Sequence, residues 1–151
     1  MNRLITIDPG AKGGIAWRDT DGEVYAINMP DGMTAQVDEL RNLSYCAMPV
    51  RIVSEKVGYH RPGNNATASC KFARHCGHIE AATYCLGIPT TQVAPNVWMK
   101  VLGALPKDKK QRKKAIKEEV QRRFPHLKVT LYTADALGIL IWATQQGDEE
   151  Q

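Results

Sequence analysis

The sequence predicts a single α/β domain with a mixed central sheet and helices on both faces. Two observations carry this prediction. Three short strand-like runs come first, and helix-like and strand-like segments then alternate along the rest of the chain. The 151 residues are enough for one hydrophobic core. We expect one domain over residues 1–146 and a frayed tail over 147–151.

The N-terminal part predicts three antiparallel strands. Residues 4–7 form an apolar run that ends at Asp8, where the following proline and glycine stop the strand. The runs 15–18 and 23–28 are joined by a turn-rich link, as in a hairpin. Asp8 is therefore expected at the end of a strand.

A helix and a fourth strand follow. Thr34 is expected to cap a helix whose apolar side chains are Val37, Leu40 and Leu43. Residues 50–55 predict a strand that again ends with a carboxylate. Ligands collect at strand ends in open α/β sheets, so this repetition points to a site.

The middle of the chain alternates again. Residues 58–65 combine proline, glycine and asparagine and predict a loop. Residues 66–86 predict a helix that Gly87 stops. A strand over 90–93 and a short helix over 95–102 are expected next.

Two helices complete the prediction. Residues 109–124 form a helix with an apolar stripe and a separate basic stripe. These stripes are Ile116, Val120 and Phe124, and Lys109, Lys113 and Lys117. Thr133 is expected to cap a last helix through Ala143, with Asp135 in its first turn.

Composition excludes several classes of protein. The hydrophobic fraction is 43%, but no apolar run is long enough to span a membrane, and the apolar start is too short for a secretory signal. We therefore expect a cytoplasmic protein with its four cysteines reduced. A zinc site remains an alternative that the spacing does not favour. Its ligands would be Cys70, His75, Cys76 and His78.

Charge is concentrated in one segment. The net charge is +4, but residues 107–123 hold nine basic and three acidic residues. A concentration of positive charge suits the binding of a polyanion such as a nucleic acid. A solvated helix face would explain the same basic residues equally well.

Three carboxylates stand at the ends of apolar elements: Asp8, Glu55 and Asp135. Buried carboxylates are costly unless they are paired or hold a cation, and an all-oxygen set favours Mg²⁺ or Mn²⁺. Each residue also has a simpler explanation. Asp8 can bond its own turn, and Asp135 can serve only as a helix-start residue.

In their order, four motifs resemble those of RuvC-type Holliday-junction resolvases, including small phage members. The motifs are residues 7–10, 13–16, 53–57 and 134–137. The likeness continues at Phe72, Gly77, 86–89 and 97–100, so it covers most of the chain.

The resemblance implies a ribonuclease H-like fold and a metal-dependent endonuclease of DNA recombination and repair. Asp8 would bridge two Mg²⁺ ions, for which Mn²⁺ could substitute, and Glu55 and Asp135 would complete the site. A metal-activated water would attack the phosphorus, leaving a 5′-phosphate and a 3′-hydroxyl. Lys109 matches a family lysine that neutralises charge in the transition state. If the chain is phage-encoded, it would act in the host cytoplasm.

The resemblance also implies partners. Tyr59 matches an aromatic wedge that opens the junction, although it can equally pack its own loop. The DNA-binding residues expected are Lys56, Tyr59, His60, Arg61, Lys100, Lys107, Lys110 and Lys113. The helix 66–86 would form a homodimer through its small residues, which can instead pack on the sheet.

One position departs from the family pattern. Tyr132 stands where a fourth ligand, aspartate or histidine, is common. This leaves open a non-catalytic protein that binds branched DNA. A second alternative is a nucleotide-binding, phosphotransferase-like domain, because the segment after Asp8 also resembles a phosphate-binding turn.

Overall fold

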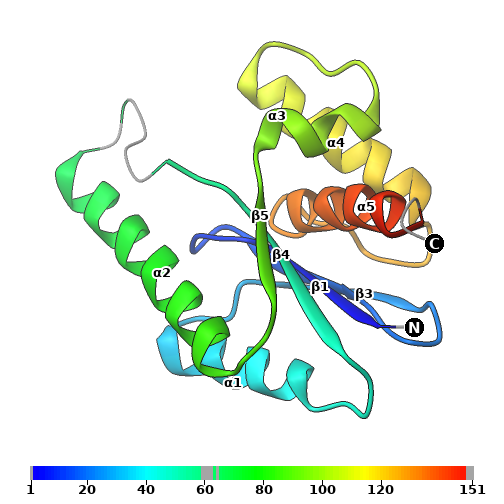
Figure 1. Ribbon diagram of the computed structural model, residues 1–151. Coiled ribbons are helices and arrows are strands. Elements are labelled where there is room, and N and C mark those ends of the chain that lie inside the picture. The colour runs from blue at the N-terminus through cyan, green and yellow to red at the C-terminus, as the bar shows by residue number, and fades with distance from the viewer. Residues whose placement is uncertain (1, 59–62, 64, 149–151) are drawn as a thin grey trace.

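The computed structural model describes residues 2–58, 63 and 65–148. It confirms a five-stranded mixed sheet with strand order β3-β2-β1-β4-β5, which Figure 1 shows at the centre of the molecule. The strands are β1 (Arg3–Asp8), β2 (Gly14–Arg18), β3 (Val24–Asn28), β4 (Val50–Glu55) and β5 (Thr90–Val93). The first three are antiparallel, and β4 and β5 run parallel to β1, as the sequence predicts.

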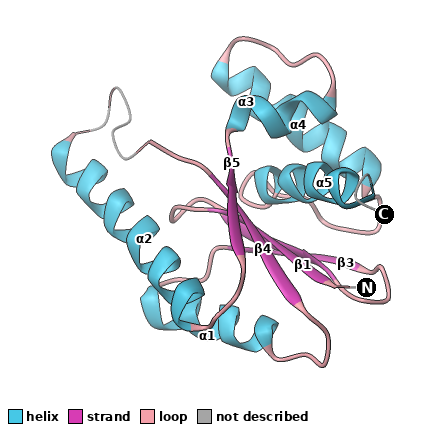
Figure 2. Ribbon diagram, viewed as in Figure 1, coloured by secondary structure: helices cyan, strands magenta, loops and turns pink. Residues whose placement is uncertain are grey.

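Helices cover both faces of the sheet (Figure 2). On one face lie α1 (Met33–Ser44) and α2 (Ala66–Cys85). On the other lies α5 (Ala134–Asp148), and beyond it are α3 (Pro95–Trp98), the 3₁₀ turn η1 (Met99–Leu102) and α4 (Lys109–Arg123). Within the part of the chain that is described, no helix combines the length and the apolarity needed to cross a membrane.

Alternation along the strands produces two cores. In β1, Ile5 and Ile7 belong to the core under α1 and α2, whereas Leu4 belongs to the core under α5. Successive strand residues point to opposite faces, so a continuous apolar run is buried on both sides. The side of β1 that carries Leu4 is therefore the side that α5 covers.

Two helix ends differ from the prediction. The assignment of Thr34 as a cap is wrong. The helix α1 begins at Met33, the residue before Thr34, and its N-cap is Gly32, which has a φ of 79°. Thr34 therefore lies inside the first turn. At the other end of the chain, α5 continues to Asp148 and thus beyond the expected Ala143.

The basic helix α4 packs as its apolar stripe predicts. Ile116 and Val120 are buried, and Phe124 packs against the same core. Arg123 donates from Nη2 to the Val101 carbonyl at 2.7 Å and so joins α4 to η1. Hydrogen bonds from two arginines of its own helix, Arg122 and Arg123, lower the pKa of Glu119 to about 2.

Candidate active site

The register of the parallel strands places two of the three carboxylates beside each other. Ile7 of β1 is paired with Ser54 of β4. The next residue of each strand is Asp8 and Glu55, respectively, and parallel strands keep their register over one residue. Neighbouring strands lie about 4.8 Å apart, so the backbones of Asp8 and Glu55 are close enough for the two carboxylates to share one ion.

A hydrogen bond ties the third carboxylate to the same face of the sheet. Thr6 donates from Oγ1 to the Ala136 carbonyl at 2.7 Å, and both groups are buried. Asp8 lies two residues beyond Thr6 and points to the same face. Asp135 is adjacent to Ala136 in the first turn of α5. The start of α5 is thus held against the end of β1.

A second contact brings the two segments together from the side of β2. Gly14 is the partner of Asp8 in the antiparallel pair. A Cβ at Gly14 would lie 2.6 Å from the Tyr132 carbonyl oxygen and 3.1 Å from Thr133 Cα. The segment that leads into Asp135 therefore packs directly on β2, next to Asp8.

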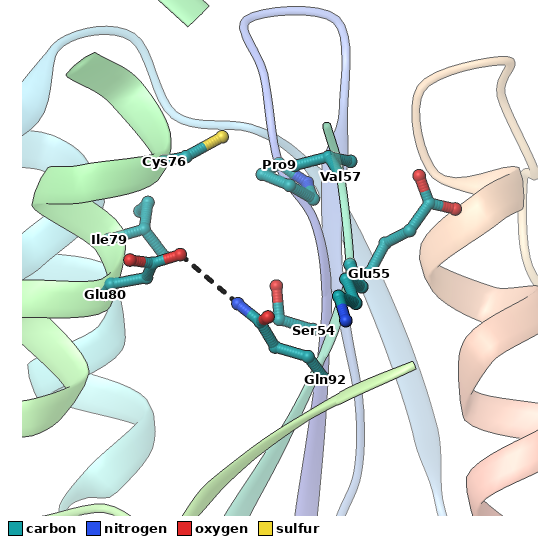
Figure 3. Close-up of a pocket in the computed structure, with 9 residues that line it drawn as sticks. Pro9, Ser54, Glu55, Val57, Cys76, Ile79, Glu80 and Gln92 are labelled. Carbon is teal, nitrogen blue, oxygen red and sulfur yellow. Dashed lines mark hydrogen bonds between the residues drawn. The ribbon is translucent and has the colours of Figure 1, made fainter. Parts of the chain in front are cut away.

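Glu55 is oriented by a buried tryptophan. Trp98 donates from Nε1 to Glu55 Oε2 at 2.8 Å, and the two residues are 1% and 8% exposed. The indole also fills the space beside Gly138 of α5, where an added Cβ would meet the ring at 2.5 Å. Figure 3 shows the Glu55 carboxylate turned toward α5 and away from α2. Trp98 thus holds Glu55 on the face that carries Asp8.

We call Asp8, Glu55 and Asp135 the acidic site. Strand register and the contacts of α5 bring the backbone segments that carry them to one face of the sheet. Among the described residues, no group of three or more histidine, cysteine, aspartate or glutamate side chains is arranged to hold a metal ion. Asp8 and Asp135 are half-buried and Glu55 is buried. An all-carboxylate set at adjoining strand and helix ends has the donor chemistry of Mg²⁺ or Mn²⁺.

The residues of the alternative zinc site do not share one environment. Cys70 is exposed, whereas His75 and Cys76 are buried. His78 bonds through Nε2 to Gln36 Oε1 at 2.6 Å and so belongs to the α1–α2 contact. All four cysteines of the chain are thiols.

A small hollow of about 120 Å³ lies on the opposite side of β4, against α2. Figure 3 shows Cys76, Ile79 and Glu80 facing the strands across it. Gln92 donates to Glu80 across this hollow at 3.2 Å, and Lys56 also lines it. Glu55 also lines this hollow, but its carboxylate points the other way, toward α5.

The expected DNA-binding lysines are exposed. Lys100 lies in η1, Lys107 in the connector before α4, and Lys109, Lys110 and Lys113 in α4. Asp108 caps α4 by accepting from the Gln111 amide at 2.8 Å, so Lys109 opens the helix as predicted. Three of the expected residues, Tyr59, His60 and Arg61, lie outside the described residues.

Sequence reasoning gave no role to Thr6, Trp98 and Gly138, which the structure places around the acidic site. Two of them carried a signal. Thr6 is a polar residue within an apolar strand, and an isolated glycine inside a helix such as Gly138 usually has a packing reason. Nothing in the sequence pairs Trp98 with Glu55.

Comparisons with known proteins identify the fold. No protein-family model and no curated protein matches the sequence. Thermus thermophilus RuvC in complex with a Holliday junction substrate matches with a TM-score of 0.59 and 18% identity, over 92% of this chain and 90% of that chain. A structure of Thermus thermophilus RuvC matches with a TM-score of 0.54 and 18% identity, over 91% and 90%.

A third match is the Fowlpox virus resolvase in complex with Holliday junction DNA, with a TM-score of 0.47 and 13% identity, over 93% of this chain and 99% of that chain. The strand order β3-β2-β1-β4-β5 and the two RuvC matches together confirm that this chain has the ribonuclease H-like fold that RuvC has.

Proposed function

We propose that this protein is a metal-dependent endonuclease that cuts four-way and other branched DNA. The proposal is supported by the register of β1 with β4 and by the contacts of the start of α5 with β1 and β2, from which we infer that Asp8, Glu55 and Asp135 share one face of the sheet. The likeness to RuvC, which was solved in complex with a Holliday junction substrate, supports the choice of DNA.

The three carboxylates would hold the ions, with Asp8 between its two partners. An Mg²⁺ or Mn²⁺ ion held there would make a water more acidic and would offset negative charge on the leaving 3′ oxygen. Trp98 acts as a positioning residue, because its N–H fixes one oxygen of Glu55. Lys109 would neutralise charge on the scissile phosphate. The products would carry 5′-phosphate and 3′-hydroxyl ends.

The experiment is cleavage of end-labelled junction, fork, flap and duplex DNA in Mg²⁺, Mn²⁺ or EDTA. We expect junction cleavage in either metal, nicks that a DNA ligase reseals directly, and a loss of at least about 100-fold in Asp8→Asn. Asp38→Asn is the matched control, because Asp38 is exposed on α1 and pairs with Arg41 in the same helix at 2.8 Å. Scission that survives Asp8→Asn or EDTA would contradict the proposal.

A non-catalytic binder of branched DNA is the second candidate. Tyr132 favours it: the residue is 38% exposed and stands three residues before Asp135, where the resolvases that this sequence resembles commonly carry a further aspartate or histidine ligand. Tight junction binding without scission would support this candidate. In that case Tyr132→Asp is expected to restore measurable cleavage, whereas Tyr132→Phe is not.

We also propose that two copies act together through α2, since a four-way junction is close to two-fold symmetric. The small residues of α2 are divided between its two sides: Ala82 is buried, whereas Gly77 and Ala81 are exposed. Tyr84, on the exposed side, is 86% exposed. Ala81→Arg is expected to halve the mass measured by light scattering, and Ala35→Arg on the exposed side of α1 is not. A monomeric wild-type protein at micromolar concentration would exclude this dimer.

A further inference from the structure

A second hollow, of about 270 Å³, lies between η1 and the connector that leads into α4. We call it the basic hollow. Its walls combine three cationic side chains with three apolar ones, and no residue that lines it carries a carboxylate. These residues are Lys100, Lys107 and Arg112, and Met99, Leu105 and Pro106.

Hydrogen bonds from α4 hold both walls of the basic hollow. Arg112 donates from Nη1 to the Lys107 carbonyl at 2.8 Å and so fixes the connector. Arg123 fixes the η1 wall through the Val101 carbonyl at 2.7 Å. Asp108, which follows Lys107 in the sequence, accepts the Gln111 amide as the cap of α4. The hollow is therefore built in advance of any ligand.

The chemistry of the walls selects the ligand. Exposed Lys100 and Lys107 attract an anion, and phosphate is the anion that a DNA strand presents. The apolar part suits a flat ring, and a methionine thioether such as that of Met99 makes favourable contacts with aromatic rings. The hollow is open to solvent, so a flat ring can lie against its apolar wall. A single unstacked nucleotide carries both a phosphate and a flat ring.

In the sequence, residues that line the basic hollow lie next to residues assigned to the acidic site and to catalysis. Trp98, which bonds Glu55, directly precedes Met99 at the start of η1. Lys109, the candidate for charge neutralisation, follows the connector by one residue. We infer that the basic hollow holds one unstacked nucleotide of the DNA strand whose neighbouring phosphodiester lies at the acidic site. This inference rests on the proposed function and adds to it a subsite for a base.

Binding rather than cleavage tests the subsite. The probe is a fluorescently labelled four-way junction with a single abasic residue, which is placed at each position around the branch point in turn. Fluorescence anisotropy measures the affinity of the protein for each junction. The buffer contains EDTA, so that metal binding does not contribute to the measured affinity. For the wild-type protein we expect a small number of positions at which base removal weakens binding about 5-fold or more. Leu105→Ser is expected to weaken binding to intact DNA by a similar factor and to be insensitive to base removal at those positions.

A second variant tests the phosphate part and does not depend on Leu105, which packs partly on the core. Lys107→Gln is expected to weaken binding and to lower the salt slope by about one. In the wild-type protein, a neutral methylphosphonate in place of the phosphate next to the sensitive base is expected to weaken binding. Lys107→Gln should remove this loss of affinity. Lys114→Gln is the matched control, since Lys114 lies on α4 outside the hollow and pairs with Glu118 at 3.8 Å.

The outcomes separate the two proposals. If wild type and Leu105→Ser lose the same factor at every abasic position, or Lys107→Gln retains the methylphosphonate penalty, the subsite is wrong and the nuclease proposal is unaffected. If Leu105→Ser is insensitive to base removal at the sensitive positions and Lys107→Gln loses the methylphosphonate penalty, but no strand is cut in Mg²⁺ or Mn²⁺, the subsite stands and the nuclease proposal fails. A wild-type protein that binds no DNA overturns both.

Discussion

Replacing Gly14 by alanine tests whether the contact between β2 and the start of α5 sets the acidic site. The new Cβ would lie 2.6 Å from the Tyr132 oxygen and 2.9 Å from the Ile27 oxygen. Both neighbours are backbone atoms, so a side-chain rotation cannot relieve either clash. Overpacking costs about 1–3 kcal/mol, and two backbone clashes place this case near the upper value. The lower entropy of the unfolded chain offsets about 0.4–1 kcal/mol.

The net loss in free energy of unfolding is therefore about 2 kcal/mol, which corresponds to a fall in Tm of about 4–8 °C for a domain of this size. Because the displaced segment leads into Asp135, we also expect cleavage to fall about 10- to 100-fold. Urea unfolding and thermal unfolding measure the first effect, and single-turnover cleavage at a temperature where both proteins are folded measures the second.

Gly77→Ala is the matched control for stability. A Cβ at Gly77 would meet nothing within 4 Å, and alanine is the better helix former, so this change is expected to stabilise the protein by about 0.5–1 kcal/mol. A Gly14→Ala protein with wild-type stability and wild-type cleavage would refute the reasoning, because it would show that the β2–α5 contact is not required.

Three further predictions follow from single contacts. Trp98→Phe removes the 2.8 Å hydrogen bond to the buried Glu55 carboxylate and should lower the free energy of unfolding by about 1.5–3 kcal/mol. A higher metal concentration should then be needed for half-maximal cleavage. Unchanged metal dependence would show that the indole does not position Glu55. Thr6→Val keeps the side-chain shape but loses the 2.7 Å bond to Ala136, so we expect a loss of about 1 kcal/mol by urea unfolding, and no loss would show that packing alone holds α5. Glu119 has a pKa lowered from 4.5 to about 2 in the folded protein, so its contribution is complete above pH 4.5 and disappears as the pH falls toward 2. Glu119→Gln should therefore be up to about 1 kcal/mol less stable than wild type at pH 7 and equal to it near pH 2, and a constant difference between those pH values would contradict the ion-pair explanation.

Regular elements were predictable because local signals agree with the tertiary structure. Alternation and turn residues located all five strands, and Gly87 located the end of α2. Thr34 shows the limit of a local rule: a threonine near a helix start is a good cap, but the glycine two residues earlier accepts the conformation that the chain needs there.

The acidic site was predictable only in part. Carboxylates at the ends of apolar elements made Asp8, Glu55 and Asp135 the candidates, and the pairing of β1 with β4 puts the backbones of the first two next to each other. What positions them was not predictable from spacing. The bond from Trp98 to Glu55 spans 43 residues, and that from Thr6 to Ala136 spans 130. Such pairs depend on how helices dock on the sheet, and a single sequence carries no local signal for that docking.

The long span between Thr6 and Ala136 affects when a nuclease of this design could become active. Asp8 is synthesised before Asp135, and all of the elements from β2 to α4 lie between the two residues in the sequence. Until residues 134–148 have docked on β1, the nascent chain has neither its third carboxylate nor the helix that anchors it. Partial translation products would therefore be unable to nick the DNA around them, and cutting would begin only after synthesis has passed the last helix.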